Sequence, residues 1–128
     1  MSRRDAREIE FKLVFEFAFN KRDNAEEFEE YTNALTADDK AYVSEVYYGI
    51  ISHYDELENK ISSAIEKFAF DRLFKVDLAI LLLAAYEINY VDSIPFKVSV
   101  DEALNLAEKY STNKSVKYIN GVLTKFAR

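Results

Sequence analysis

The stretch Val76–Ile88, VDLAILLLAAYEI, is apolar on every side of a helix, and it decides the fold predicted for this chain. It is rich in Leu and Ala, which are strong helix formers. A bilayer span takes roughly 20 apolar residues, more than lie between Asp77 and Glu87. Continuous apolar sequence of this length is typical of a helix that neighbours bury on all sides. We therefore predict a buried central helix surrounded by the other elements.

The composition predicts one all-helical domain. The 128 residues are enough to bury a core without metals or disulfides. Only 2 glycines and 1 proline are present, too few for the many turns of an all-β sandwich, whereas helices with short polar links fit. Cysteine is absent, which excludes disulfides and thiolate chemistry. The first residues contain no apolar signal segment, so we expect a cytoplasmic protein without membrane attachment.

Apolar residues at three- and four-residue spacing predict further helices on both sides of the central one. A short acidic helix is expected over Asn24–Leu35, and a longer helix follows it. The expected N-caps are Ser2 on the first helix, Thr36 on the third, Asp55 on the fourth and Ser99 on the sixth. Gly49 interrupts the third helix, and close approach of a neighbouring helix explains it best.

The last stretch is open to two interpretations. Asn120-Gly121 is a strong two-residue turn signal and predicts a hairpin. Val116, Ile119 and Leu123 instead mark one face of a helix. An isolated hairpin on a helical domain is marginally stable, so the periodicity favours the helix.

Charge is distributed unevenly along the chain. The net charge of −6 does not by itself suit binding to phosphates, and Glu8–Glu58 is strongly acidic. From Lys109 onward, however, every charged residue is basic. Arg3, Arg4 and Arg7 lie on the first helical turns, where cations oppose the helix dipole. Something other than helix stability therefore accounts for these arginines.

Four stretches are distinctive when taken in order. They are Arg3–Glu8 (RRDARE), Lys75–Glu87 (KVDLAILLLAAYE), Ile94–Ala103 (IPFKVSVDEA) and Ser115–Leu123 (SVKYINGVL). Together they resemble the NusB family of bacterial transcription antitermination factors, over the whole chain. The resemblance implies an all-α domain spanning residues 1–128, with about seven helices in two small bundles around a shared, buried central helix. It also implies that the last stretch is helical.

The resemblance implies a function in RNA binding. Family members bind single-stranded boxA RNA, pair with NusE, a ribosomal small-subunit protein, and join the elongation complex that transcribes ribosomal RNA operons. The positions that match the family's RNA-contacting motifs are Arg3, Arg4, Arg7, Lys117 and Tyr118. Asp77 stands where the family has an acidic or polar residue near the RNA and NusE surfaces, and Asn120 is a further candidate RNA contact. The Tyr118 ring would stack on a splayed base while Lys117 meets phosphate; such stacking contributes about 1–3 kcal/mol per base.

The sequence departs from the family pattern at three positions. Lys12 stands where Gln is common, Phe15 where Tyr is common, and Leu82 where Arg often lies in the central helix. The loss of the arginine makes the central helix more apolar, and Lys12 extends the basic N-terminal surface. These changes affect the RNA affinity and the geometry of partner binding that the resemblance implies.

Other functions stay open. The chain could be a relative of the NusB-like domain that precedes some ribosomal RNA methyltransferases, or a helical protein–protein adaptor or homodimer without an RNA role. It carries no glycine-rich nucleotide loop and no Gly-x-Ser-x-Gly elbow, so we expect neither enzyme activity nor a cofactor. His53 is the lone histidine, and we expect no metal site. The oligomeric state and the preferred RNA bases do not follow from the sequence.

Overall fold

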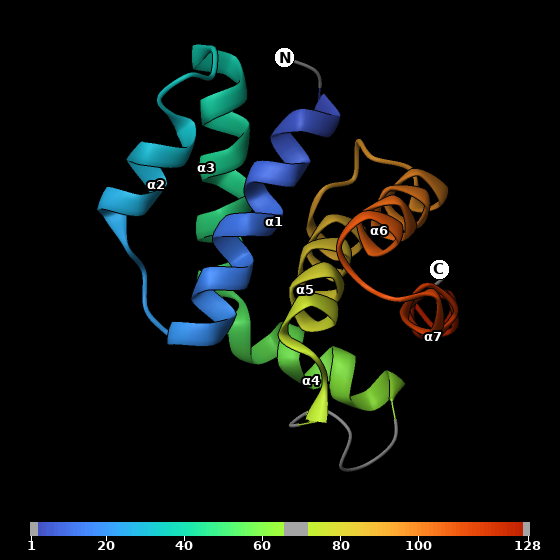
Figure 1. Ribbon diagram of the computed structural model, residues 1–128. Helices are drawn as coiled ribbons and strands as arrows, with labels where there is room; N and C mark the ends of the chain where they lie inside the picture. The colour runs from blue at the N-terminus through green and yellow to red at the C-terminus, as the bar shows by residue number, and fades with distance from the viewer. Residues whose placement is uncertain (1–2, 66–71, 127–128) are drawn as a thin grey trace.

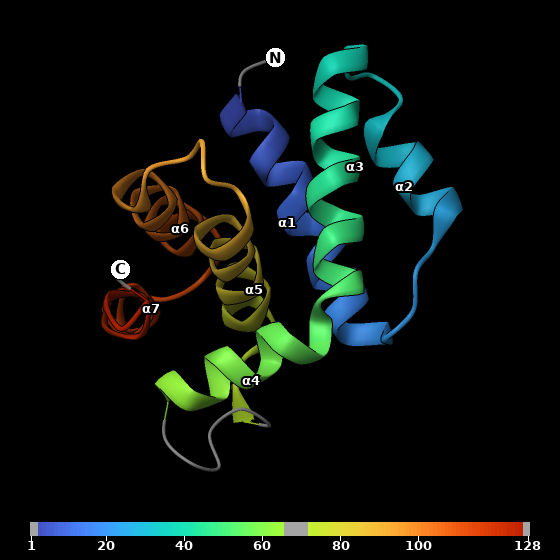
Figure 2. The same cartoon turned by 180° about the vertical axis from the view of Figure 1, so that it is seen from behind.

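The computed structural model describes residues 3–65 and 72–126 and forms seven α-helices within them. They are α1 (Arg3–Asn20), α2 (Ala25–Thr32), α3 (Ala37–Ser52), α4 (Tyr54–Ala64), α5 (Lys75–Tyr90), α6 (Phe96–Tyr110) and α7 (Asn113–Thr124). Figure 1 shows α5 between two groups, with α1, α2 and α3 on one side and α6 and α7 on the other. The reverse view in Figure 2 shows α4 crossing one end of α5. The all-α prediction is confirmed.

The central helix is buried along most of its length. Every residue from Asp77 to Ile88 is buried, and α5 contacts α1, α3, α4, α6 and α7. Leu82 is fully buried, so an arginine at this position would have to bring a charge into the core of this chain. Within the described residues, no helix combines the length and apolar character that crossing a bilayer requires.

The first helix is less completely buried than its phenylalanines suggest. Phe11 is buried and Phe15 is partly buried, whereas Phe19 at the C-terminal end of α1 is 65% exposed. The three rings form a row, with centroids 6.4 Å apart between Phe11 and Phe15 and 6.2 Å apart between Phe15 and Phe19. The aromatic row of α1 thus runs from the core out to the surface.

The predicted helix starts are partly correct. Thr36 caps α3 as expected, because its Oγ accepts from the Asp39 amide at 3.2 Å. Asp55 is not a cap, since α4 begins one residue earlier at Tyr54. Ser99 is not a cap either: α6 begins directly after Pro95, and the Ser99 hydroxyl donates to the buried Glu87 carboxylate instead. The expected cap Ser2 lies outside the described residues.

The two glycines have different surroundings. A Cβ at Gly49 would overlap the ring and hydroxyl of Tyr86 in α5, so the predicted close approach at this glycine is confirmed. A Cβ at Gly121 would meet nothing within 4 Å. Asn120 and Gly121 lie inside α7, which confirms the helical interpretation of the last stretch and rules out the hairpin.

Candidate RNA interface

The N-terminal arginines occupy different environments. The backbone of Arg3 begins α1, and its side chain lies outside what the structure describes. The Arg4 side chain is 65% exposed, and its Nε and Nη2 atoms donate to the two Glu102 carboxylate oxygens at 3.2 and 3.0 Å. The Glu102 hydrogen bonds raise the pKa of Arg4. Arg4 is therefore a permanent surface cation beside α6.

Arg7 is buried and anchors α1 to the core. Its Nε lies 3.0 Å from Glu87 Oε2, and Ser99 Oγ donates to Glu87 Oε1 at 2.9 Å. Burial lowers the pKa of Arg7, but the hydrogen bond and charge of Glu87 outweigh it and raise the pKa overall. Although it is buried, Arg7 also lines a hollow between α1 and α6. Arg7 therefore anchors α1 to α5, and an RNA contact at this residue stays a prediction.

Asp77 is a second buried anchor. It is 5% exposed and accepts hydrogen bonds from Ser111 Oγ at 2.6 Å and from Ser115 Oγ at 2.7 Å. These bonds tie the start of α5 to the loop and first turn of α7. Thr112 caps the same turn by accepting from the Ser115 amide at 3.0 Å. Asp77 therefore positions α7, and it also lines an open groove between α5 and α7.

The other predicted residues on α7 face solvent. Lys117 and Asn120 are exposed, and Tyr118 is 39% exposed, off the buried face formed by Ile119 and Leu123. Tyr118 lines an open groove of about 610 Å³, within the roughly 300–1,000 Å³ range of small-ligand pockets. The remaining groove residues are Phe74, Asp77, Thr112, Asn113, Lys114 and Ser115.

Among the residues of this α5–α7 groove that were not predicted from the sequence, two are suited to binding RNA. Phe74 is 65% exposed just before α5, and Lys114 is exposed on the first turn of α7. An exposed aromatic side chain and an exposed cation are the groups that stack on a base and meet a phosphate. The signal for Lys114 was available, since it lies in the basic segment that begins at Lys109.

A second hollow lies beside the groove, under the aromatic row of α1. Its volume is about 230 Å³, and Phe11, Phe15, Tyr31, Val76 and Tyr110 form its apolar lining. Phe11 stacks on Tyr110 with ring centroids 4.9 Å apart. Lys12 and Glu16 lie at the same hollow. The basic substitution at Lys12 therefore belongs to this surface, as the sequence predicted.

A third hollow, of about 120 Å³, lies between α1 and α6. Its lining residues are Arg4, Arg7, Glu8, Glu102, Asn105, Leu106 and Lys109. Lys109 Nζ lies 2.7 Å from Glu8 Oε1, and the Tyr110 hydroxyl donates to the same oxygen. These two hydrogen bonds lower the pKa of Glu8, so its carboxylate stays charged at neutral pH.

The three hollows are neighbours on one surface. Tyr110 lines the second hollow and donates a hydrogen bond to Glu8, which lines the third. Val76 lines the second hollow, and the next residue, Asp77, lines the α5–α7 groove. We call this surface, from Arg4 to Tyr118, the track. It brings the start of α1 and the first turns of α7, more than one hundred residues apart in sequence, onto one continuous face.

Comparison with models of protein families shows to which family this chain belongs. The model of the NusB family matches residues 4–128. The chain belongs to the NusB family. Among curated relatives, the transcription antitermination protein NusB of Natranaerobius thermophilus is 44% identical over 99% of this chain and 95% of its own length. That of Agathobacter rectalis is 42% identical over 99% of this chain and 100% of its own length.

Solved NusB structures share the fold. A structure of T. maritima NusB is 32% identical, with a TM-score of 0.92 over 99% of this chain and 91% of that one. Antitermination factors NusB and NusE in complex with dsRNA contain a chain that is 24% identical, with a TM-score of 0.87 over 97% of this chain and 94% of that one. This second likeness concerns the fold alone.

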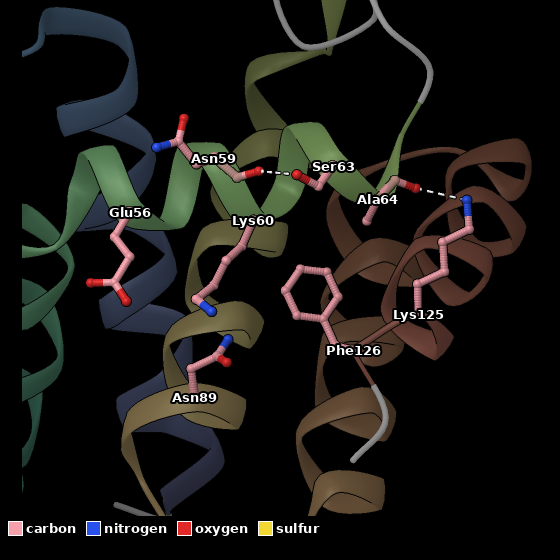
Figure 3. A pocket seen from close by; sticks show the side chains of 8 residues that line it. All are labelled: Glu56, Asn59, Lys60, Ser63, Ala64, Asn89, Lys125 and Phe126. Carbon is pink, nitrogen blue, oxygen red and sulfur yellow. Dashed lines mark hydrogen bonds between the residues drawn. The ribbon is translucent and has the colours of Figure 1, made fainter.

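This NusB-family chain has a further hollow away from the track. Figure 3 shows it at the corner of α4, α5 and the end of α7, where Lys60, Asn89 and Phe126 face a common space of about 500 Å³. Lys125 Nζ donates to the Ala64 carbonyl at 2.8 Å and so satisfies a terminal carbonyl of α4. None of its lining residues belongs to the track.

The next feature of this NusB-family chain is the placement of its histidine and acidic residues, the side chains that could bind a metal ion. His53 Nδ1 lies 2.9 Å from the Gly49 carbonyl, and its ring centroid is 4.3 Å from that of Tyr90. His53 thus packs at the α3–α4 junction, as a structural histidine would. Among residues 3–65 and 72–126, no group of three or more His, Asp or Glu is placed to hold a metal ion.

Proposed function

We propose that this chain is a transcription antitermination factor that binds a single-stranded, boxA-type RNA along the track. It would act with NusE in the elongation complex that transcribes ribosomal RNA operons. The observation that carries the proposal is the track itself, in which Arg4 of the N-terminal segment and Tyr118 of α7 share one face. The names of the curated relatives and the NusB–NusE–dsRNA neighbour support it.

Each part of the track has a role in this proposal. Tyr118, together with Phe74, offers an exposed ring on which a base stacks. Lys114 and Lys117 meet phosphates beside it, and Arg4 does so at the far end. Arg3 precedes Arg4 in the basic N-terminal segment. Asn120 is exposed on α7, two residues after Tyr118.

Arg7 and Asp77 are buried residues that line the track and hold it in place. Each is buried in a hydrogen-bonded cluster that fixes one of the helices carrying the contacts. They affect RNA affinity by holding α1 and α7 in place. Residues 1–128 act as one RNA-binding domain in the cytoplasm, without enzyme activity.

The acidic net charge is compatible with RNA binding because many of the acidic side chains lie away from the track. Glu26, Glu29 and Glu30 are exposed on α2, and Asp38 is exposed on α3. The pKa of Glu27 is raised by burial and by the nearby Glu16 and Glu30, as expected for a crowded acidic face. None of these residues except Glu16 lines the track. The local charge of the track decides phosphate binding, not the sum over the chain.

Titration of a boxA-type RNA, with and without NusE and at several salt concentrations, tests the proposal. We expect weak binding by the chain alone and tighter binding with NusE. The affinity should fall as salt rises, because each phosphate contact releases a counterion. Absence of RNA binding even with NusE would favour the adaptor hypothesis, in which the same face serves protein contacts only.

A further inference from the structure

The α1–α6 edge of the track carries two matched ion pairs. Arg4 of α1 pairs with Glu102 of α6, and Lys109 of α6 pairs with Glu8 of α1. Both pairs line the same hollow, together with Asn105. Each helix therefore supplies one cation and one carboxylate to this edge, and the two pairs bridge the same two helices in opposite directions.

The cations of these two pairs are more exposed to solvent than the carboxylates. The side chains of Arg4 and Lys109 are 65% and 59% exposed, whereas those of Glu102 and Glu8 are 15% and 21% exposed. An incoming phosphate thus meets the cations first, with the two carboxylates directly behind them. A carboxylate and a phosphate offer the same kind of acceptor oxygens, and the guanidinium fork fits either of them.

We propose that the α1–α6 edge is a phosphate-binding surface of the RNA site, formed by Arg4 and Lys109, and that Glu102 and Glu8 limit its affinity by competing with the RNA backbone. The proposal rests on the RNA-binding function proposed above. It adds Lys109 to the RNA contacts, and it assigns the two glutamates a role that opposes binding. In the free protein each cation is paired with a carboxylate. In the complex, phosphate oxygens share the cations with the carboxylates or displace the carboxylates from them.

The weakness of exposed ion pairs makes this exchange feasible. Pairs at the surface are screened by water and salt and contribute little to stability, so breaking them opposes binding only slightly. The carboxylate charge stays beside the phosphate after exchange, however, and repels it. Removal of one such charge should tighten RNA binding roughly threefold to tenfold, the effect expected of one unit charge a few ångströms away at a protein surface.

The variant Glu102→Gln isolates this effect. The amide oxygen of glutamine still accepts a hydrogen bond from Arg4, so the geometry is retained while the charge is removed. Its matched control is Glu29→Gln, which neutralises the carboxylate of the exposed Lys40–Glu29 pair on α2 and α3, away from the track. Both variants change the net charge by the same amount, so any difference between them is local.

The measurement is the affinity of each variant for a boxA-type RNA at several salt concentrations. We expect Glu102→Gln to bind more tightly than both the wild type and Glu29→Gln, and Lys109→Ala to bind less tightly, with a log–log salt slope shallower by about one. Equal affinities for Glu102→Gln and Glu29→Gln, or weaker binding by Glu102→Gln, would overturn the inference while the wild type still binds. If the wild type itself does not bind RNA, the proposed function fails first.

Discussion

Tyr118 is an exposed aromatic residue of α7. It is 39% exposed and lies off the buried face of α7, in a groove with Phe74 and Lys114. The groove therefore combines two aromatic rings and a cation at an open surface, the combination that binds single-stranded nucleic acid.

Replacement of Tyr118 by Ala should weaken RNA binding by about 1–3 kcal/mol, because one stacked base loses its ring. The salt slope should hardly change, since stacking releases no counterions. Titrations at several salt concentrations measure both quantities. Tyr118→Phe is the matched control, because it keeps the ring and should keep most of the affinity. A large change in slope for Tyr118→Ala would show that its role is electrostatic.

Arg7 should matter for stability, since its guanidinium compensates the buried Glu87 carboxylate, which is 2% exposed. Arg7→Met should lower the free energy of unfolding by about 3–5 kcal/mol, because it leaves that charge buried without its cation. Urea denaturation measures the loss. The double variant Arg7→Met/Glu87→Leu should lose less than Arg7→Met alone, since no unpaired charge remains. A greater loss in the double variant would contradict this explanation.

The sequence identified residues of the track from both ends of the chain, and their RNA contacts stay predictions. Arg4, Lys117 and Tyr118 were predicted as contacts, and they face solvent on the track or next to it. Arg7 and Asp77 were predicted as contacts too; both are buried and line the track. Their partners, Glu87, Ser111 and Ser115, lie 34 to 80 positions away in the chain, so no local pattern reveals the pairing.

At the scale of elements, helix periodicity predicted the arrangement well. The central helix and the helical nature of the last stretch followed from apolar spacing. The predicted caps at Asp55 and Ser99 were wrong, because a polar residue near a helix start can have a better use. Ser99 lies inside α6 and donates to Glu87, a partner that only the folded chain brings near.

The two glycines allow a direct test of the α3–α5 contact. Gly49→Ala should lower the free energy of unfolding by about 1–3 kcal/mol, because the new methyl group overlaps the buried Tyr86 ring. Gly121→Ala is its control and should raise stability by up to about 1 kcal/mol, since alanine favours the helix and nothing lies nearby. Thermal or urea denaturation measures both. Equal effects of the two substitutions would contradict close packing at Gly49.

At the scale of the whole molecule, the central helix organises the site without taking part in ligand contact along most of its length. Its buried middle holds α1 on one side and α6 and α7 on the other (Figure 1). Only the residues at its start, Phe74, Val76 and Asp77, reach the track. The fold thereby joins two segments from opposite ends of the chain.

The family resemblance predicted a surface shared by both ends of the chain, whereas composition alone did not. The sequence showed a basic C-terminal segment and an arginine-rich start. The contacts that bring these regions together involve Glu8, Glu102 and Tyr110, to which the sequence assigned no role in a shared surface. These are long-range contacts between α1 and α6, and they follow only from how both helices pack on α5.

The most direct test of the shared surface is an NMR titration of the isotope-labelled chain with a boxA-type RNA. We predict that the largest amide shift changes fall together in residues 3–12 and 109–121, at one RNA stoichiometry and affinity. Residues 25–52, which carry the acidic face of α2 and α3, should change little. Shift changes confined to one end of the chain, or centred on α2 and α3, would contradict a single RNA surface built from both ends.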